Sequence, residues 1–279
     1  MNAPFQVSDA AERIDQHSGS GIAVKIDHVQ KIFETRDGDE VIALDGTDLT
    51  VAAGEFVAVV GPSGCGKSTL LSMIAGIDSP TSGRILVDNK PLIGPNPRTS
   101  VVFQNDYLLP WRNIIDNVLL PIEIKRLDTR LYRERAEALL TQVGLAGFGG
   151  RFPLELSGGM RQRVAICRAV IQEPGLLLMD EPFGALDALT REQMIMDLQN
   201  LWLRLKNTVV FITHGIDEAV FLADRVIVMS RRPGRIDMQL DIDLPRPRKW
   251  NEIHRNPGFT EAVAKVRGRF EEQGVLKAS

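Results

Sequence analysis

The amino-acid sequence predicts an α/β fold built around a mostly parallel core sheet. The run Glu55–Val60 is almost entirely apolar and is bounded by glycines, which is typical of a strand buried on both faces. Helical patterns alternate with short apolar runs from residue 158 to residue 229. An alternating pattern at residues 22–50 and a helical stretch at about residues 105–160 add an antiparallel β subdomain and a helical insertion.

The two N-terminal strands are predicted from the alternation of apolar and polar residues. Val24 and Ile26 alternate in the first run, and Val41 and Ala43 alternate in the second. The polar segment Thr35–Glu40 lies between these runs, as expected for the turn of an antiparallel pair. This pattern therefore predicts that the main unit begins with β-strands.

The order of the later elements follows from periodicity and from prolines. Ser68–Ala75 is expected to form a helix, Ser100–Phe103 a strand, and Asn113–Leu120 and Leu131–Val143 the helices of the insertion. The remaining expected elements are helix Gly158–Ile171, strand Leu176–Met179, helix Leu189–Leu205, strand Val209–Ile212, helix Ile216–Ala223 and strand Val226–Met229.

The two ends of the chain differ from its centre. Residues 1–21 lack the apolar core of a secretory signal or a transit peptide, and we expect a flexible tail there. Residues 251–279 are expected to form a helical extension of the main unit at residues 22–250. Its apolar residues recur at helical spacing and predict packing on that unit; they are Phe259, Val263, Val266 and Phe270.

Composition narrows the function classes. The chain has 279 residues with 33 Lys and Arg against 36 Asp and Glu, and a formal net charge of -3. This balance lacks the basic footprint of a dedicated nucleic-acid binder. Two cysteines are too few for a disulfide framework and favour a reducing compartment. Every apolar run is far shorter than the roughly 18 residues that indicate a membrane span, so the chain is not expected to cross a bilayer itself.

A glycine-rich segment after the first core strand carries the clearest chemical signal. Its pattern, Gly-x-x-x-x-Gly-Lys-Ser, lets successive backbone N–H groups close around phosphate oxygens. Lys67 is then placed to reach the β and γ phosphates, and Ser68 offers its hydroxyl to Mg²⁺. We expect nucleotide contacts along the whole segment, which comprises Gly61, Pro62, Ser63, Gly64, Cys65, Gly66, Lys67, Ser68 and Thr69.

Two adjacent carboxylates, Asp180 and Glu181, follow the predicted strand Leu176–Met179. Asp180 is placed to bind Mg²⁺ directly or through water. Glu181 is expected to face the γ-phosphate, where a carboxylate can orient the attacking water or accept its proton. Simple solvation at a strand end is the alternative for such a pair, but the phosphate loop upstream favours the catalytic interpretation.

The segment Leu156-Ser-Gly-Gly-Met160 places a serine and two glycines at a helix start, which is a second anion-binding geometry. With the phosphate loop and the acidic pair, this segment resembles the Leu-Ser-Gly-Gly-Gln signature of ATP-binding cassette (ABC) ATPases, over about residues 22–244. The resemblance implies a P-loop NTPase cassette that binds and hydrolyses ATP with Mg²⁺. It also implies a head-to-tail homodimer in which Ser157, Gly158 and Gly159 of one chain cover the nucleotide of the other.

The resemblance assigns further residues to the nucleotide site. Gln104 resembles the Q-loop glutamine that senses Mg²⁺ and the γ-phosphate, and Asp187 matches the D-loop. His214 resembles the switch histidine that holds the γ-phosphate, whereas a lone histidine there would be an ordinary strand-end residue. Phe33 lies where an aromatic residue, usually tyrosine, stacks on adenine; an ordinary strand residue is the alternative.

Two residues depart from the family pattern. Met160 replaces the usual glutamine of the signature, and Gly215 replaces the common aspartate after the histidine. We expect the first change to affect communication across the dimer and the second to affect local turn geometry. Neither removes a phosphate contact made by the backbone, by Ser157 or by Lys67.

Three segments resemble the cassettes of bacterial nitrate, sulfonate and taurine importers, namely Leu108–Trp111, Arg232–Ile236 and Leu244–Arg248. Tyr107, Leu108, Leu109 and Trp111 either line the groove for a coupling helix of the membrane subunit or fill the insertion's own core. The resemblance implies a peripheral protein at the cytoplasmic face of the inner membrane. Its expected partners are integral membrane permease subunits and, indirectly, an extracytoplasmic solute-binding protein, with no nucleic acid.

Other functions of the same fold remain as alternatives. These are an importer cassette for another solute, an exporter cassette, and a soluble mechanical ATPase of DNA repair, chromosome maintenance or translation. The interval from Lys67 to Ser157 lacks the sustained heptads of the repair and chromosome types, and the chain carries a single cassette, unlike the translation type. A small-molecule kinase would leave the signature and the D-loop unexplained.

Overall fold

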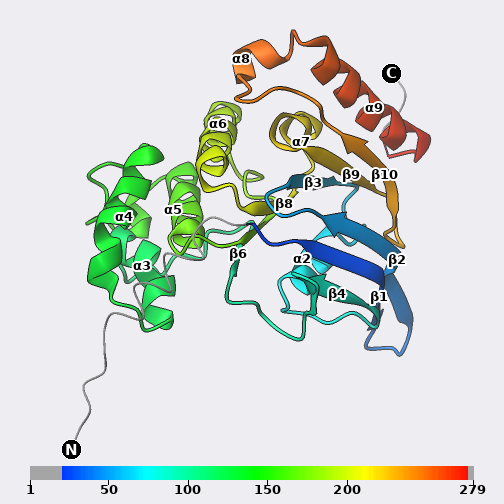
Figure 1. The fold of residues 1–279 in the computed structure, drawn as a ribbon, viewed down its shortest axis with the longest axis horizontal. Coiled ribbons are helices and arrows are strands. Elements are labelled where there is room, and N and C mark those ends of the chain that lie inside the picture. The colour runs from blue at the N-terminus through cyan, green and yellow to red at the C-terminus, as the bar shows by residue number, and fades with distance from the viewer. Residues whose placement is uncertain (1–20, 276–279) are drawn as a thin grey trace, which may run out of the picture.

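The computed structural model describes residues 21–275, so all but the last residue of the expected tail at residues 1–21 lies outside the described part of the chain. Its core is a six-stranded sheet in the order β10-β9-β3-β8-β7-β6 (Figure 1). In this sheet the neighbouring pairs β9–β3, β3–β8, β8–β7 and β7–β6 are parallel, and only β10 runs antiparallel to its neighbour β9. The mostly parallel sheet is therefore confirmed. Its strands are β3 (Phe56–Val60), β6 (Thr99–Val102), β7 (Leu176–Asp180), β8 (Thr208–Ile212), β9 (Arg225–Met229) and β10 (Ile236–Asp241).

A second sheet is antiparallel, in the order β2-β1-β4-β5. The long pair β1 (Val24–Glu34) and β2 (Glu40–Val51) was expected from the sequence. The hairpin of β4 (Ser82–Val87) and β5 (Lys90–Pro91) was not. Its two turn residues, Asp88 and Asn89, have φ values of 48° and 60°, as the tight turn of a two-residue hairpin requires.

The helices surround the core sheet, and α3, α4 and α5 form a lobe on one side of it (Figure 1). Among residues 21–275, no helix has the length and apolar character needed to cross a membrane. The helices are α2 (Lys67–Ile74), α3 (Ile114–Ile124), α4 (Thr129–Gln142), α5 (Gly158–Val170), α6 (Ala188–Leu205), α7 (Ile216–Leu222), α8 (Trp250–Ile253) and α9 (Pro257–Glu272), with a 3₁₀ turn at Pro153–Glu155.

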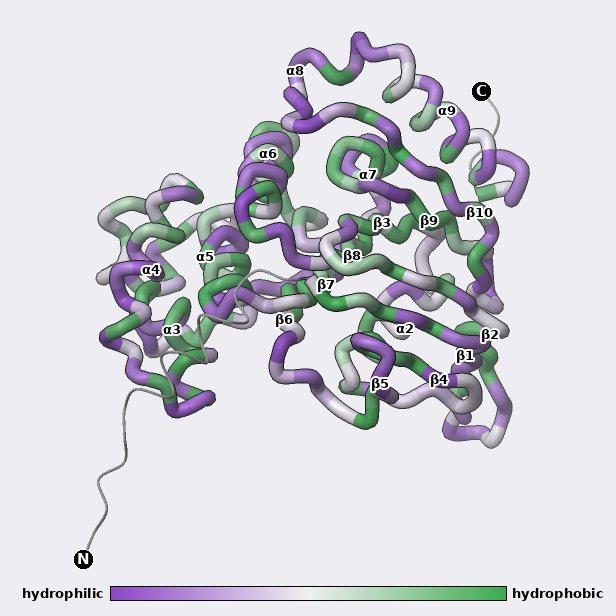
Figure 2. Tube along the Cα trace, viewed as in Figure 1, coloured by the Kyte–Doolittle hydropathy of each residue, from purple (hydrophilic) through white to green (hydrophobic). Residues whose placement is uncertain are grey.

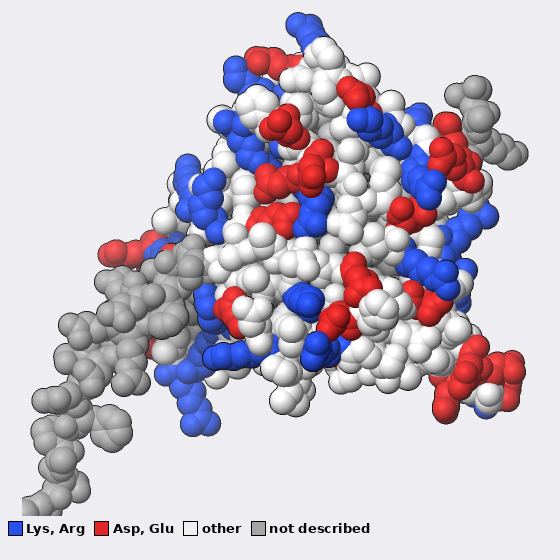
Figure 3. All heavy atoms as spheres, turned by 45° about the vertical axis from the view of Figure 1, so that its right-hand side comes forward, with Lys and Arg blue, Asp and Glu red and all other residues white. Residues whose placement is uncertain are grey.

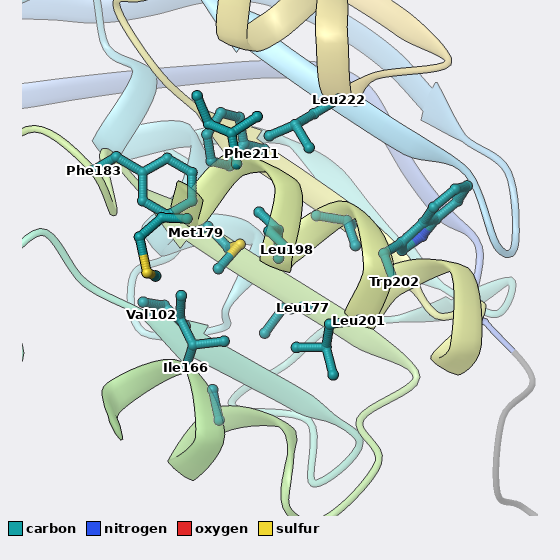
Figure 4. Packing of buried hydrophobic residues seen from close by; sticks show 14 of the residues in the cluster. Val102, Ile166, Leu177, Met179, Phe183, Leu198, Leu201, Trp202, Phe211 and Leu222 are labelled. Atoms are coloured by element: carbon teal, nitrogen blue, oxygen red, sulfur yellow. The ribbon is translucent and has the colours of Figure 1, made fainter. Parts of the chain in front are cut away.

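Each face of the core sheet contributes to a different hydrophobic cluster, because successive strand residues point to opposite faces. Val57 and Val59 of β3 pack with α2 and the antiparallel sheet. Phe56 and Ala58 face the other cluster, where Phe211 packs between Phe56 and Phe183 (Figure 4). Burial on both faces explains why β3, β7, β8 and β9 are apolar nearly throughout, as the hydropathy colouring shows (Figure 2).

The surface carries acids and bases intermixed, without one dominant sign on the face that Figure 3 shows. Several of these side chains form exposed ion pairs, such as Arg84 with Asp27 and Lys249 with Glu252. Exposed pairs of this kind contribute at most about 1 kcal/mol each. The stability of the fold therefore depends mainly on the two buried clusters.

The C-terminal segment is fixed to the core by a buried arginine. Arg248 is 4% exposed, and its guanidinium donates to the carbonyl oxygens of Val220, Phe221 and Ala223 at the end of α7, at 2.7–2.9 Å. Burial lowers the pKa of Arg248 to about 10. The segment beyond it carries α9, whose apolar residues pack on the larger cluster, with Phe259, Val266 and Phe270 buried and Val263 partly buried.

Replacement of Arg248 by alanine is expected to lower the free energy of unfolding by about 3 kcal/mol, because it leaves buried carbonyl groups without donors. Urea denaturation followed by circular dichroism measures this change. Arg84→Ala, which removes an exposed arginine, serves as the control and should cost less than about 1 kcal/mol. Equal stability of the two variants would contradict the assigned role of Arg248.

Candidate nucleotide-binding and catalytic site

The phosphate loop connects the end of β3 to the first residue of α2. Gly66 precedes the helix with a φ of +96°, and a β carbon there would lie 2.9 Å from the carbonyl oxygen of Ala43. Glycine is therefore required both by the backbone conformation and by the close approach to β2. Ser63 and Gly64 are exposed at the tip of the loop, whereas Thr69 is partly buried on α2.

Lys67 lies buried beneath this loop. Its ammonium group donates to the carbonyl oxygens of Gly61 at 2.8 Å and Pro62 at 3.0 Å. Cys65 is also buried, and burial raises the pKa of its thiol despite the nearby charge of Lys67. The thiol is therefore a packing group, whereas the lysine places a positive charge inside the loop.

Ser68 and Asp180 bring two oxygen donors together from α2 and β7. The Ser68 hydroxyl donates to Asp180 Oδ1 at 3.1 Å. Burial raises the pKa of Asp180, the neighbouring Glu181 carboxylate raises it further, and the bond from Ser68 opposes both effects. A divalent cation would relieve the crowding of negative charge, and hard oxygen donors suit Mg²⁺. The residues present therefore fit a magnesium site.

Glu181 has a left-handed backbone, with a φ of 43°. Its amide donates to the Ile212 carbonyl at 2.9 Å, which fixes this unfavourable conformation against β8. Its Oε2 lies 3.3 Å from His214 Nδ1. Gln104 and Glu181 both approach Gly184. A β carbon built on this glycine would lie 3.6 Å from Gln104 Nε2 and 3.8 Å from Glu181 Oε2. The structure thus gathers Gln104, Glu181 and His214 into one cluster at the ends of three parallel strands.

The signature residues lie at the start of α5. Ser157 caps this helix by accepting a hydrogen bond from the Met160 amide at 3.3 Å, so the cap uses the backbone of residue 160 and is independent of its side chain. Ser157 and Gly158 are exposed, whereas Gly159 is buried, and a β carbon there would lie 2.6 Å from Thr190 Cγ2.

Asp187 and Phe33 are two further predicted site residues that are exposed. Asp187 caps α6 by accepting from the Thr190 amide at 3.0 Å, and the hydrogen bonds from Thr190 lower its pKa. Phe33 lies on β1 with 42% of its surface exposed, and the ammonium of Lys31 lies 4.9 Å from the ring centroid. The ammonium covers one face of the ring, so any stacking on a planar ring would use the other face.

The apolar segment after Gln104 divides between surface and core. Tyr107 and Trp111 are 61% and 71% exposed, whereas Leu108 is buried in the larger cluster. Arg168 of α5 holds this segment by donating to the carbonyl oxygens of Tyr107 and Asp106 at 2.8 and 2.6 Å. Leu108 therefore fills the core, as one interpretation of the sequence predicted, whereas contact of Tyr107 and Trp111 with a membrane subunit stays a prediction.

A buried acid behind the histidine was missed at the sequence level. Thr213 donates to Glu218 at 2.6 Å and accepts from the Gly215 amide at 3.0 Å. Burial is the main cause that raises the pKa of Glu218. A β carbon on Gly215 would lie 2.8 Å from the Glu218 carboxyl carbon, so the glycine leaves room for this acid. The sequence signal that could have revealed this residue is an acid in the first turn of the helix that follows Gly215.

Comparison with known proteins gives the same assignment as the geometry. The family model described as "ABC transporter" matches residues 44–184. An uncharacterized ABC transporter ATP-binding protein of Methanocaldococcus jannaschii is 48% identical, covering 92% of this chain and 94% of the relative. The taurine import ATP-binding protein TauB of Rhizobium johnstonii is 46% identical, covering 92% and 99% respectively.

The fold agrees with a solved cassette as well. The dimeric ATP-binding cassette MJ0796 in a post-hydrolysis state bound to ADP and Pi matches with a TM-score of 0.70 and 32% identity, over 80% of this chain and 100% of that one. The chain belongs to the ABC transporter family. It is an ABC ATPase cassette, a nucleotide-binding enzyme whose family works with membrane transport components. The α/β fold with its β subdomain and helical insertion is confirmed.

Two substitutions separate nucleotide binding from turnover in this cassette. Lys67→Ala is expected to abolish productive ATP binding because it removes the cation inside the loop. Glu181→Gln is expected to retain binding but to lower kcat by at least about 100-fold, because the amide cannot accept a proton. Equilibrium binding of ATP and steady-state phosphate release measure the two effects. Normal turnover by Glu181→Gln would refute the role of Glu181.

Proposed function

We propose that this cassette is the ATP-hydrolysing subunit of an importer for a small oxyanion such as nitrate, an alkanesulfonate or taurine. The observation that supports hydrolysis is the cluster of Gln104, Glu181 and His214 beside the loop that holds Lys67. The substrate class is supported by the similarity to the taurine import protein. We place the protein at the cytoplasmic face of the membrane, as a peripheral subunit.

In the proposed reaction the phosphate loop binds the phosphates of ATP through its N–H groups, and Lys67 balances their charge. Ser68 and Asp180, together with Gln104, are the residues that would hold Mg²⁺. The ion, when bound, neutralises charge on the phosphate oxygens. Glu181 orients the attacking water and takes its proton. His214 holds the γ-phosphate, and its 3.3 Å contact with Glu181 keeps that carboxylate in place.

The proposed active unit is a head-to-tail dimer of cassettes. Ser157, Gly158 and Asp187 are exposed at two helix starts, where they are free to meet a second chain. Structures of MJ0796 are dimeric, which supports such an assembly here. Each nucleotide then lies between the phosphate loop of one chain and the signature of the other. Within each chain, we propose that residues 22–250 form the cassette and that residues 251–279 form its C-terminal helical extension.

The proposed contact with the permease lies at the helical lobe. Trp111 is exposed, and the loop before α3 that carries it is braced by the buried Asn117, whose amide binds the carbonyl oxygens of Leu109, Arg112 and Asn113 at 3.0–3.1 Å. A neighbouring pocket of about 450 Å³ has a mixed lining. Its apolar residues include Phe103, Tyr107, Leu120, Pro121 and Ile124, and its polar residues include Lys125, Arg168 and Gln172. We assign this surface to a coupling helix of the permease.

Closure of the dimer on ATP would move this surface and switch the permease between inward and outward access. The transported anion does not touch this chain in the proposal. Selection of the solute therefore belongs to the permease and to an extracytoplasmic binding protein. Alternatives are a cassette for another solute or for export.

Mixed dimers test the composite site. Chains carrying Lys67→Ala and chains carrying Ser157→Ala should combine into dimers with one doubly altered site and one intact site. We expect ATP-dependent association, which neither variant shows alone, to return in part in the mixture. Size-exclusion chromatography with Mg-ATP measures it. Absence of complementation at every mixing ratio would argue against this arrangement.

Reconstitution with the permease tests both the coupling surface and the substrate class. In liposomes, ATPase activity should rise only with a loaded binding protein and one of the oxyanions. Trp111→Ala is expected to reduce transport at least about tenfold while leaving ATP affinity unchanged, because the exposed ring contributes contacts to the partner only. Ile93→Ala, which alters a residue that is 94% exposed on another surface, is the matched control.

Stimulation by sugars or amino acids but by no oxyanion would overturn the substrate class and leave the ATPase assignment intact. Equal transport by the Trp111→Ala and Ile93→Ala proteins would overturn the proposed coupling surface.

A further inference from the structure

The loop between β9 and β10 packs directly on the phosphate loop. We call Ser230–Arg235 the brace loop. A β carbon on its Gly234 would lie 2.0 Å from the carbonyl oxygen of Cys65, so the two main chains are in contact with no room for a side chain. Gly234 also exchanges hydrogen bonds with β2, donating to Ala43 and accepting from the Asp45 amide, both at 3.0 Å. The brace loop therefore links β2 to the phosphate loop.

Arg232 extends from the brace loop to the exposed tip of the phosphate loop. Its Nε and Nη2 atoms both lie 3.3 Å from the carbonyl oxygen of Gly64. On the other side of this peptide unit, the Cys65 amide lies 3.3 Å from the Pro62 carbonyl oxygen. The plane of the Gly64–Cys65 peptide is thus held from both ends, at a glycine whose φ of +75° few other residues adopt.

Other contacts keep the brace loop itself in place. Arg235 forms an ion pair with Asp45 of β2, and Arg231 donates to the carbonyl oxygen of Gly274 after α9. Directly after the loop, Asp237 accepts from Arg269 of α9 at 2.6 Å. The backbone of Arg232 is therefore anchored to two other parts of the fold, and its side chain can hold the flexible glycine.

We propose that Arg232 is a positioning residue for the phosphate loop. By binding the Gly64 carbonyl it fixes the Gly64–Cys65 peptide, and with it the backbone path of the phosphate loop. A loop that is ordered before binding loses less conformational entropy when the ligand arrives, so the effect is on nucleotide affinity and not on the chemical step. The inference rests on the proposed function of the phosphate loop in ATP binding.

The test compares Arg232→Ala with Arg231→Ala, which removes the same charge from the adjacent position but has its contact at Gly274. Binding of a fluorescent ADP analogue and steady-state ATPase kinetics are measured on the full chain. We expect Arg232→Ala to raise the Kd for ADP and the KM for ATP about fivefold, with kcat changed less than about twofold. Arg231→Ala removes one anchor of the brace loop but leaves the anchors of Arg235 and Asp237 and the Arg232 contact with Gly64, so it should raise the Kd for ADP less than about twofold.

Rescue separates a contact from a general loss of order. Arg232→Lys should recover part of the affinity, because an ammonium can still donate to the Gly64 carbonyl. Thermal melting checks that the variants are folded, and Arg232→Met, which keeps an unbranched side chain but has no donor, replaces the alanine variant if that protein is unstable.

Three results would overturn the proposal: unchanged affinity in Arg232→Ala, an equal loss in Arg231→Ala, or a fall in kcat without a change in KM. Failure of the unaltered protein to bind ADP would instead refute the proposed function, and this inference with it.

Discussion

Direct contact between main chains holds the phosphate loop in place, and this contact depends on glycine. A β carbon at Gly66 would lie 2.9 Å from the Ala43 carbonyl oxygen, and one at Gly234 would lie 2.0 Å from that of Cys65. Any side chain at either position would push the loop away from its support. Because α2 begins immediately after Gly66, the positions of Lys67 and Ser68 depend on the same contacts.

The remaining catalytic candidates are brought together by the direction of the core strands. Gln104 follows β6, Asp180 and Glu181 end β7, and His214 follows β8. Parallel neighbours place their carboxyl ends at one edge, with strands about 4.8 Å apart, so residues distant in sequence become neighbours there. The left-handed backbone of Glu181 then turns its carboxylate toward His214.

The sequence is informative where one physical requirement determines the pattern. Burial on both faces makes β3 apolar throughout and β8 apolar after Thr208, and the phosphate loop needs glycine at fixed spacing, so the strands and the loop were predictable. The β4–β5 hairpin was not, because β5 has only two residues, Lys90 and Pro91, which are too few to show an alternating pattern.

Leu108 shows a different limit of sequence reasoning. An apolar residue in a helical insertion fits the core and a docking surface equally well, and only packing decides between them. The signature was recognisable from the sequence as an anion-binding helix start. The nucleotide that we propose for it is bound by the phosphate loop of a second chain. Arg168 binds the segment that carries Tyr107 through main-chain carbonyl groups only. The exposed side chains of Tyr107 and Trp111 take no part in this attachment or in the ion pair of Asp106 with Arg161, so substitutions at these two positions can accumulate without detaching the segment from α5. A lineage of these proteins can therefore change the surface that this segment presents while keeping its connection to α5.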